Sequence, residues 1–264
     1  RMAGKLLPPI LDTISEYCMQ SEQDSRRIRH LGAPAGRVRV TGNLKFDMQP
    51  PQIDSGELAA LRSQLRLPGD ARIWVAGSTH DGEEAQVAEV YQRLRKICPE
   101  LFLVLVPRHP ERCRQVQDDL GKQNITTTLR STLAEVRKDL QPGEILIVDT
   151  LGEVLKFYAL SELVFVGGSL VDIGGHNILE AAVLKKPVMY GSHMQNFKEI
   201  ARLVRAAHAG LQVKNADDLY RQMRILIENP DEAIRIGENG HHLLEENRGA
   251  TQRTLEVIDR RMLT

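Results

Sequence analysis

The sequence predicts an α/β protein built on a Rossmann-like, doubly wound parallel sheet. Short apolar segments alternate along the chain with longer segments whose apolar residues recur at helical spacing. The apolar segments lack the polar alternation of a half-exposed strand, so we expect helices to cover them on both faces. Strands that alternate with helices in this way form a doubly wound sheet.

Six apolar segments are the predicted strands of this sheet. They are Ile73–Gly77, Leu101–Pro107, Glu144–Asp149, Glu162–Gly168, Pro187–Gly191 and Gly210–Val213. The segment Glu83–Ile97 follows the first strand and has the apolar spacing of a helix. After Ala216 the sequence predicts helices throughout, over residues 216–228, 231–246 and 250–262.

The first 48 residues predict a separate β-α-β unit. Tyr17–Gln20 is typical of a strand, Ser21–Gly32 of a capped helix that ends at glycine, and Arg37–Gly42 of a second strand. The prolines of Met48–Gly56 indicate a linker, because proline cannot continue regular structure. We therefore expect three parts: residues 1–48, a main domain over 49–247, and a C-terminal helix over 248–264.

The composition narrows the class of function. Hydrophobic residues make up 42% of the chain, which is enough for a packed core. Lys plus Arg and Asp plus Glu are equal at 35 each, whereas nucleic-acid-binding proteins usually carry a basic excess. We therefore expect no nucleic acid as a partner. Three cysteines without a paired motif, Cys18, Cys98 and Cys113, favour a reducing compartment.

Polar residues and glycines directly follow four of the predicted strands. In an open parallel sheet, ligands bind beyond the carboxyl ends of the strands, so these residues are expected to meet at one edge. The positions concerned are Ser78, Thr79 and His80; Pro107, Arg108 and His109; Asp149 to Glu153; and Gly167, Gly168 and Ser169. This convergence predicts a binding site.

The residue types at this edge suit a nucleotide. Arg108 offers a planar, permanently charged fork for a phosphate. Gly167 and Gly168 let backbone N–H groups approach an anion. Asn177 is expected to begin a helix, whose N-terminus favours negative charge. Glu180, one turn further along, can accept hydrogen bonds from ribose hydroxyls. The sequence therefore predicts phosphate at the glycines and Arg108, and sugar at Glu180.

Structural interpretations compete with these functional ones. Asn177 and Glu180 have the spacing of a helix capping box, as do Asp81 and Glu84, and capping is preferred for each pair taken alone. The other structural interpretations are a tight turn at Gly167 and Gly168, a surface ion pair of Arg108, and ordinary strand-end positions for His80, His109 and His176.

Two common nucleotide fingerprints and any metal signature are missing from the sequence. Neither GxGxxG nor GxxxxGK[ST] occurs, so the dinucleotide and P-loop motifs are absent. No grouping of His, Cys and Asp has the spacing of metal ligands. We therefore expect neither a metal nor a cofactor.

Six short motifs resemble one known family and occur in this order. They are VTGNLKFD (Val40–Asp47), STHDGEE (Ser78–Glu84), LVPRHPER (Leu105–Arg112), FVGGSL (Phe165–Leu170), GGHNILEAA (Gly174–Ala182) and NFKEI (Asn196–Ile200). The set resembles the bacterial Kdo transferases, the 3-deoxy-D-manno-octulosonic acid transferase family, over nearly the whole chain.

The resemblance implies the C-terminal domain of a two-domain GT-B glycosyltransferase. The family transfers Kdo from CMP-Kdo to a lipid A precursor in lipopolysaccharide biosynthesis, at the cytoplasmic face of the bacterial inner membrane. Its motifs imply CMP contacts at Pro107, Arg108, Leu151, Gly152, Glu153, Asn177, Ile178, Leu179 and Glu180. The expected supporting residues are Ser78, Thr79, His80, His109, Gly167, Gly168, Ser169 and His176.

The resemblance also implies parts beyond these residues. The family's catalytic base is a glutamate in the N-terminal acceptor domain, which also meets the membrane surface. The chain begins RMAGKLLPP, and residues 1–48 resemble the end of that domain. We therefore expect no catalytic residue in this chain, a soluble piece, and no transfer by the piece alone.

Two other functions remain open at this point. One is another GT-B enzyme that uses a UDP-sugar, and the other is a non-catalytic module that binds a nucleotide. Comparing CMP with UDP binding separates the first from a Kdo transferase. Restoring an N-terminal domain and finding no transfer favours the second.

Overall fold

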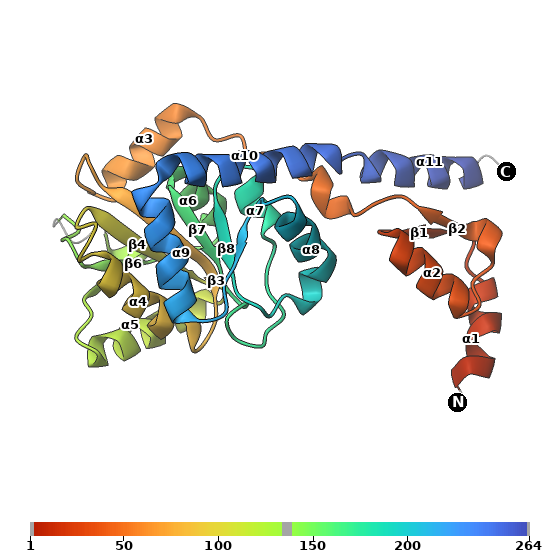
Figure 1. Ribbon diagram of the computed structural model, residues 1–264, viewed down its shortest axis with the longest axis horizontal. Helices are drawn as coiled ribbons and strands as arrows, with labels where there is room; N and C mark the ends of the chain where they lie inside the picture. The colour runs from red at the N-terminus through yellow and green to blue at the C-terminus, as the bar shows by residue number, and fades with distance from the viewer. Residues whose placement is uncertain (1–2, 134–138, 263–264) are drawn as a thin grey trace. The chain divides into compact units, whose positions relative to one another are not determined.

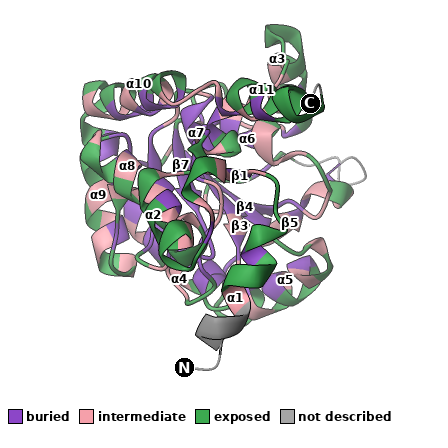
Figure 2. Cartoon of the chain, turned by 90° about the vertical axis from the view of Figure 1, so that its right-hand side faces the viewer, coloured by how far each residue is buried: buried purple, intermediate pink, exposed green. Residues whose placement is uncertain are grey.

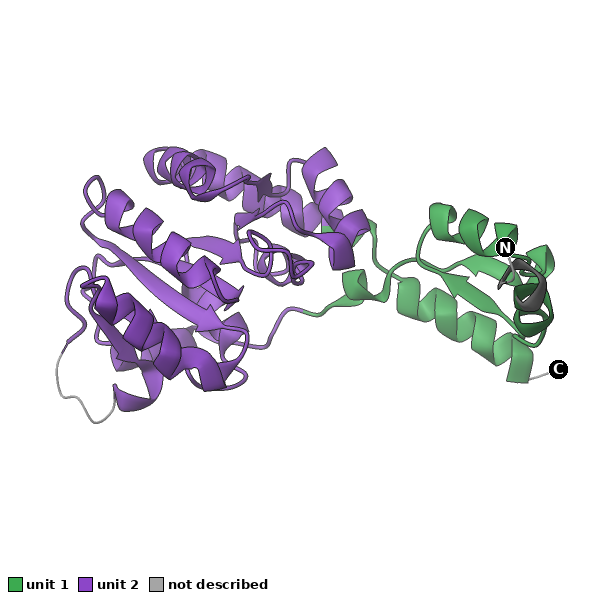
Figure 3. Ribbon diagram, turned by 90° about the horizontal axis from the view of Figure 1, so that it is seen from below, with its two compact units in different colours: residues 1–49, 244–264 green, residues 50–243 purple. Residues whose placement is uncertain are grey.

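The computed structural model describes residues 3–133 and 139–262, which form two compact units (Figure 3). Unit 1 comprises Arg1–Gln49 together with Leu244–Thr264, and unit 2 comprises Pro50–Leu243. The last helix of the chain therefore belongs to the same unit as the first 49 residues. Helix α10 (Pro230–Glu246) begins in unit 2 and ends in unit 1.

Unit 2 is built on a seven-stranded sheet in which every neighbouring pair is parallel. Its strands are β3 (Arg72–Thr79), β4 (Leu101–Pro107), β5 (Thr127–Leu129), β6 (Ile145–Ile147), β7 (Leu163–Val166), β8 (Val188–Tyr190) and β9 (Leu211–Gln212). Their spatial order is β5-β6-β4-β3-β7-β8-β9. The predicted doubly wound parallel sheet is confirmed.

Helices cover the sheet (Figure 1); most of them join one strand to the next, and the first and last precede and follow the strands in the sequence. They are α3 (Ser55–Gln64), α4 (Glu83–Leu94), α5 (Cys113–Lys122), α6 (Val154–Leu160), α7 (Leu179–Ala182), α8 (Lys198–Ala206) and α9 (Ala216–Glu228). Helices α4 and α9 contact each other, whereas α6 packs against β3, α3 and α7. The site described below lies among the loops that link these layers.

The core explains why the strands lack polar alternation. Trp74 and Ala76 of β3 belong to one apolar cluster with Val87 of α4. Ile73 lies before Trp74, and Val75 lies between Trp74 and Ala76. Both are also buried and face the opposite layer, because successive side chains of a strand alternate. Figure 2 shows the strands buried inside and the exposed residues on the helices and loops. Burial on both faces is what the continuous apolar runs predicted.

Unit 1 contains the predicted β-α-β arrangement. Strands β1 (Tyr17–Met19) and β2 (Val38–Val40) pair in parallel, and helix α2 (Glu22–His30) connects them. Ser21 caps α2 by accepting a hydrogen bond from the Asp24 backbone N–H. The unit also holds α1 (Ala3–Asp12) and α11 (Ala250–Met262).

Asp47, at the end of the VTGNLKFD motif, fastens the start of α11. Its Oδ1 accepts a hydrogen bond of 2.6 Å from the Gly249 N–H, and its Oδ2 accepts one from the Thr251 N–H. Arg253 of α11 in turn donates to the Thr41 carbonyl oxygen at 2.7 Å. The motif therefore joins two segments of unit 1 that are about two hundred residues apart, which identifies a structural role for it.

Candidate functional site

The topology of the sheet points to a ligand site at the carboxyl end of β3. The chain passes from β3 to β4 on one side, and it later enters β7 on the other side. In open α/β sheets such a reversal leaves a crevice beyond the carboxyl ends of the strands, where ligands bind. The loops that follow β3, β4 and β7 meet beyond these carboxyl ends, so three of the four strand ends that were predicted to converge lie together.

The ends of β3 and β4 are joined directly. The pairing register of the two strands shifts between Gly77 and Thr79, and Ser78 adopts a left-handed backbone with φ of 55°. The Arg108 N–H donates to the Thr79 carbonyl oxygen at 2.9 Å. Pro107 is buried and Arg108 is exposed, so the guanidinium points away from the core at the carboxyl edge of the sheet.

Arg108 forms no ion pair in the part of the chain that the structure describes, and its guanidinium donates no hydrogen bond there. The interpretation of Arg108 as a surface ion pair is therefore wrong. Burial raises the pKa of Glu180 and lowers the pKa of His80 and His176; the Arg108 charge opposes the first shift and adds to the other two, so the four side chains lie near one another. A free, permanently charged fork at this edge is suited to an anionic ligand.

Three histidines from three loops form a cluster beside Arg108. The Nε2 atoms of His80 and His176 are 2.8 Å apart, and their ring planes lie within 7° of parallel. His109 meets the His80 ring edge-on, at a centroid distance of 5.7 Å. Burial, followed by the neighbouring His80 and Arg108, lowers the pKa of His176 to about 4. These histidines are therefore more than ordinary strand-end residues.

Glu83 takes the backbone donors that the sequence assigned to phosphate. Its fully buried carboxylate accepts hydrogen bonds from the N–H groups of His80 (3.0 Å), Gly168 (2.6 Å), Ser169 (3.0 Å) and Leu170 (2.9 Å). Those amides are satisfied within the protein and cannot bind a phosphate. The expectation that Gly167 and Gly168 supply amides to the ligand is therefore wrong, because this first part of the loop after β7 binds an internal carboxylate instead.

The residues around this carboxylate have structural roles. The Gly167 N–H donates to the Gly77 carbonyl oxygen at 2.8 Å, and a Cβ at Gly167 would lie 2.6 Å from the Ser78 carbonyl oxygen. Gly167 therefore permits a close approach of two strand ends. Ser169 is fully buried, and its Oγ accepts a hydrogen bond of 2.7 Å from the Gly191 N–H. Ser169 therefore links the loop after β7 to the end of β8.

The predicted capping pair at the start of α4 is not formed. Gly82 is the residue before the helix, and no side chain caps it. Asp81 and Glu84 instead each accept a hydrogen bond of 3.1 Å from Arg112. Burial raises the pKa of Glu84, although Arg112 opposes the shift. Glu83, for which the sequence predicted no role, accepts a hydrogen bond from the His80 N–H at this end of the helix.

The second glycine pair brings two further loops together. The Gly175 N–H donates to the Gly168 carbonyl oxygen at 2.7 Å, and the Asn196 N–H donates to the Gly174 carbonyl oxygen at 3.0 Å. A Cβ at Gly174 would collide with the Asn196 side chain, and one at Gly175 with Met194. Both glycines have positive φ, so their conformation and their packing each require glycine.

Helix α7 begins later, and is shorter, than predicted. It covers four residues, and Asn177 lies two residues before it. Asn177 Oδ1 accepts a hydrogen bond of 3.3 Å from the Leu179 N–H. The N–H groups of His176, Asn177 and Ile178 donate to no acceptor within residues 3–133 and 139–262. These unpaired amides, rather than the dipole of a long helix, are the backbone donors left at the site.

Glu180 is half-buried in the first turn of α7. Its pKa is raised by burial, and Arg108 and a hydrogen bond from the Asn177 side chain oppose this. The capping-box bond from the Asn177 N–H to the Glu180 carboxylate is not among the hydrogen bonds of the described residues. Tyr158 of α6 lies beside Gly77, and burial, then the nearby Glu180, raises the pKa of Tyr158. The carboxylate is therefore available to a ligand.

The loop after β6 lies at the start of α6. Leu151 is 83% exposed, and Gly152 has φ of +78°. The Glu153 carboxylate accepts a hydrogen bond from the Thr150 hydroxyl and lies 3.6 Å from Arg130. Because α6 packs against α7 and β3, this loop is placed next to the segment that carries Glu180.

The structure thus brings most of the predicted residues together, in altered roles. Pro107, Ile178 and Leu179 are buried, so only their backbone atoms or neighbours can meet a ligand. Glu83 and Tyr158 were missed. Glu83 lies one position from a predicted capping residue, but three of its four hydrogen-bond partners are more than eighty residues away. No set of three or more His, Cys, Asp and Glu side chains among the described residues is arranged to hold a metal ion.

Comparisons with known proteins agree with this architecture. A family model described as 3-deoxy-D-manno-octulosonic-acid transferase (kdotransferase) matches residues 1–48. A 3-deoxy-D-manno-octulosonic acid transferase of Haemophilus influenzae is 37% identical over 259 residues, which are 97% of this chain and 60% of that protein. The chain thus spans less than two thirds of this relative.

Two of the solved structures that are similar to the chain bear on its fold and family. One is the C-terminal CMP-Kdo binding domain of WaaA from Acinetobacter baumannii, with a TM-score of 0.64 and 30% identity. That match covers 72% of this chain and 96% of the domain. The other is HepE of Anabaena in complex with UDP and glucose, with a TM-score of 0.58, 15% identity, and coverage of 93% of this chain and 62% of HepE. At that identity the second shows the fold alone, which is the GT-B arrangement of glycosyltransferases. The 30% identity to the first of these structures, together with the six motifs of the sequence, shows that this chain belongs to the 3-deoxy-D-manno-octulosonic acid transferase family.

Proposed function

We propose that unit 2 binds CMP-Kdo as a glycosyl donor and that the protein transfers Kdo to a lipid A precursor. The observation that carries this proposal is the unpaired Arg108 guanidinium, which shares the crevice with Glu180. The similarity to a CMP-Kdo binding domain, almost all of which the chain covers, supports the choice of ligand. A negatively charged group and a sugar hydroxyl are the partners that these two side chains suit.

The phosphate of CMP is assigned to Arg108 and to the unpaired N–H groups of His176, Asn177 and Ile178. These donors lie on the loops that flank the topological switch of the sheet. Glu180 is assigned to the ribose hydroxyls. The exposed turn at Leu151 and Gly152, next to α7 through α6, is assigned to the cytosine end.

The chemistry assigned to this site is stabilisation of the leaving group. The bond between Kdo and phosphate breaks as an acceptor hydroxyl attacks, and negative charge grows on the departing CMP. Donors already in place at that position lower the barrier, because they need no reorganisation during the step. Arg108 and the free amides supply such donors without a metal or cofactor. The general base is expected in the acceptor domain of this family, outside the motifs that these residues match.

Lipopolysaccharide biosynthesis, with action at the cytoplasmic face of the bacterial inner membrane, is part of the same proposal. It rests on the family and on the chemistry of a lipid acceptor. Within the described residues, no helix combines the length and the apolar character that a membrane span requires.

Calorimetric titration of the chain with CMP, UMP, UDP and cytidine tests the proposal. We expect CMP to bind more tightly than UMP and UDP, and cytidine to bind weakly, because it lacks the phosphate. Tighter binding of UDP than of CMP would indicate a GT-B enzyme with a UDP-sugar donor. Binding of none of the four would contradict a nucleotide site in this crevice.

A further inference from the structure

The two histidines that meet at the crevice are joined through their ring edges. Rings stacked face to face cannot bring two nitrogen atoms to 2.8 Å, so the contact between the Nε2 atoms of His80 and His176 is a hydrogen bond. One ring donates its Nε2–H and the other accepts. A Cβ at Gly168 would lie 2.9 Å from the His176 ring and 3.3 Å from the His80 ring. Glycine at this position therefore leaves room for the two edges to meet.

This arrangement can hold one extra proton and no more. In the neutral pair the donating ring keeps a lone pair on its Nδ1. A proton added there makes that ring an imidazolium, while its Nε2–H still donates to the partner, and the bond becomes charge-assisted. A second proton would place two N–H groups against each other. The pair is thus built for a change of one charge.

The surroundings keep the pair neutral when no anion is present. Burial is the largest effect that lowers the pKa of both rings. His109 and Arg108, from the loop after β4, act in the same direction on both, and Arg112 adds to this at His80. Glu83 opposes them at His80, but its carboxylate already accepts four backbone hydrogen bonds. Burial, together with these neighbouring groups, therefore favours the neutral pair.

We propose that the His80–His176 pair takes up one proton from solvent when the nucleotide phosphate binds beside Arg108, and so adds a second cation to the phosphate site. This inference rests on the proposed function. A phosphate would neutralise Arg108 and place negative charge near the rings, and an opposite charge within about 4–6 Å typically raises a histidine pKa by about 1–3 units. The proton comes from bulk solvent, and apart from N–H formation no covalent bond is made or broken.

Calorimetry with CMP at about pH 6, in two buffers of different ionisation enthalpy, measures this uptake directly. We expect proton uptake, up to one proton per CMP bound, that fades as the pH rises above about 7. Linkage then requires the CMP affinity to weaken by up to about tenfold per pH unit over the range in which the pair is protonated in the complex and neutral in the free protein, and to level off above that range. The phosphate of CMP also titrates, with a second pKa of about 6. If the site prefers the dianion, binding releases a proton from the phosphate, which is the opposite of the uptake expected for the histidine pair.

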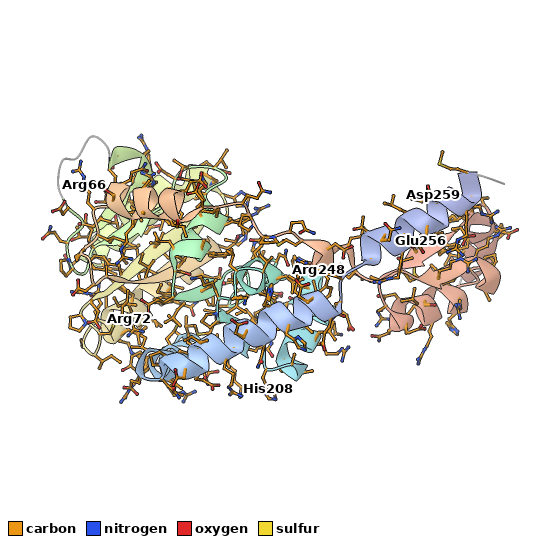
Figure 4. The ribbon with its side chains drawn as sticks, turned by 90° about the horizontal axis from the view of Figure 1, so that it is seen from above. Arg66, Arg72, His208, Arg248, Glu256 and Asp259 are labelled. Carbon is orange, nitrogen blue, oxygen red and sulfur yellow. The ribbon has the colours of Figure 1, made fainter. Side chains whose placement is uncertain are left out.

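Variants separate the pair from other titrating groups. The double variant His80→Gln/His176→Gln keeps polar atoms near both Nε2 positions but cannot gain the charge, so uptake should vanish. His208→Asn is the matched control, because His208 is exposed on the turn after α8 and has φ of 51°, which Asn tolerates (Figure 4). It should retain the full uptake. Wild-type uptake needs no variant, so a folding defect in the double variant leaves the main measurement intact.

The outcomes distinguish this inference from the function on which it rests. CMP binding with no proton uptake overturns the inference and leaves the nucleotide site standing. Uptake that persists in the folded double variant assigns the proton to another group and also overturns it. Failure of CMP to bind at all overturns both proposals together. Cytidine should bind without uptake, because it brings no charge to the rings.

Discussion

Arg108 and Glu180 carry opposite charges in the same crevice, yet they form no ion pair. Neither side chain is neutralised by a close partner of opposite charge among the described residues, although Asn177 hydrogen-bonds Glu180. Burial of the Glu180 carboxylate without an ion-pair partner costs stability, and a carboxyl group with a perturbed pKa beside an unpaired arginine is typical of a binding site. Substitutions of Arg108 and Glu180 therefore test the proposed nucleotide site most directly.

Arg108→Ala should weaken CMP much more than cytidine. A hydrogen bond to a charged group is worth about 1.5–3 kcal/mol, which corresponds to roughly a ten- to hundredfold loss for CMP. Arg108→Lys keeps the charge but loses the planar fork, so its affinity should lie between those of the parent and the Ala variant. Calorimetric titration with both ligands measures the difference. Equal losses for CMP and cytidine would move Arg108 away from the phosphate.

Glu180→Gln should stabilise the ligand-free protein at neutral pH while weakening CMP. Burial raises the pKa of Glu180, so the folded state holds its proton more tightly than the unfolded state. Ionising Glu180 therefore costs folded-state stability, and this cost appears as the pH rises above 4.5, the ordinary value. The variant should melt higher than the parent at about pH 7 and equally at about pH 4.

The CMP affinity of Glu180→Gln should fall roughly tenfold to a hundredfold, because the variant loses a charged hydrogen-bond acceptor. Glu89→Gln, at an exposed site on α4, is a matched control and should change neither property. If Glu180→Gln binds CMP like the parent and Glu180→Ala merely melts lower, Glu180 acts only in the local structure around α7.

At the scale of elements, the Glu83 carboxylate fixes the relation between the loops after β3 and β7. It bonds the His80 N–H on one loop and three consecutive N–H groups, from Gly168 to Leu170, on the other. A parallel sheet leaves such loop amides unpaired beyond its strand ends, and here an internal anion satisfies them. The rigid loops then place the two histidines and the crevice.

Glu83→Gln should destabilise unit 2 by about 1–3 kcal/mol, because a side-chain amide cannot accept all four bonds and presents its own N–H groups to donors. Urea unfolding of the variant against the parent measures this loss. Glu83→Asp should also be destabilised, since its shorter side chain cannot reach both loops. A Glu83→Gln variant as stable as the parent would show that the carboxylate is not what holds these loops.

The accuracy of the sequence predictions differs between elements for physical reasons. Helices α9, α10 and α11 match the predicted ranges to within a residue or so, because their apolar spacing is set locally. The strand Thr127–Leu129 was missed because a three-residue edge strand carries almost no pattern of its own. Helix α7 begins at Leu179 and not at the predicted Asn177, and its Leu179, Ala181 and Ala182 are buried in the core.

The site shows the same division between local and distant information. The predicted position of Arg108 at the carboxyl end of a strand is confirmed, because the end of a strand follows from the sequence that precedes it. The burial of Glu83 could not be predicted, because it depends on a loop 85 residues away. Nor could the meeting of His80 with His176, which are separated by 96 residues.

At the scale of the whole molecule, the chain combines two units of different size and contact pattern. Unit 2 has its own seven-stranded sheet and main core, whereas unit 1 has a two-stranded sheet and a separate small cluster around Tyr17 and Val38. The polypeptide passes between them at Gln49 and again within α10. Separate cores predict separate responses to a ligand that binds only one unit.

Saturating CMP should therefore stabilise unit 2 selectively. At a concentration of about one hundred times Kd, a ligand adds about 2.7 kcal/mol to the unit that binds it. For a unit of this size, that corresponds to a rise in melting temperature of roughly 5–10 °C. Hydrogen exchange followed by mass spectrometry should show slower exchange in the strands β3, β4 and β7 with CMP present. Exchange in β1 and β2 should be unchanged, because their hydrogen bonds belong to the other core. Equal protection of both units would mean that they open together, with α10 as the element that transmits the stabilisation.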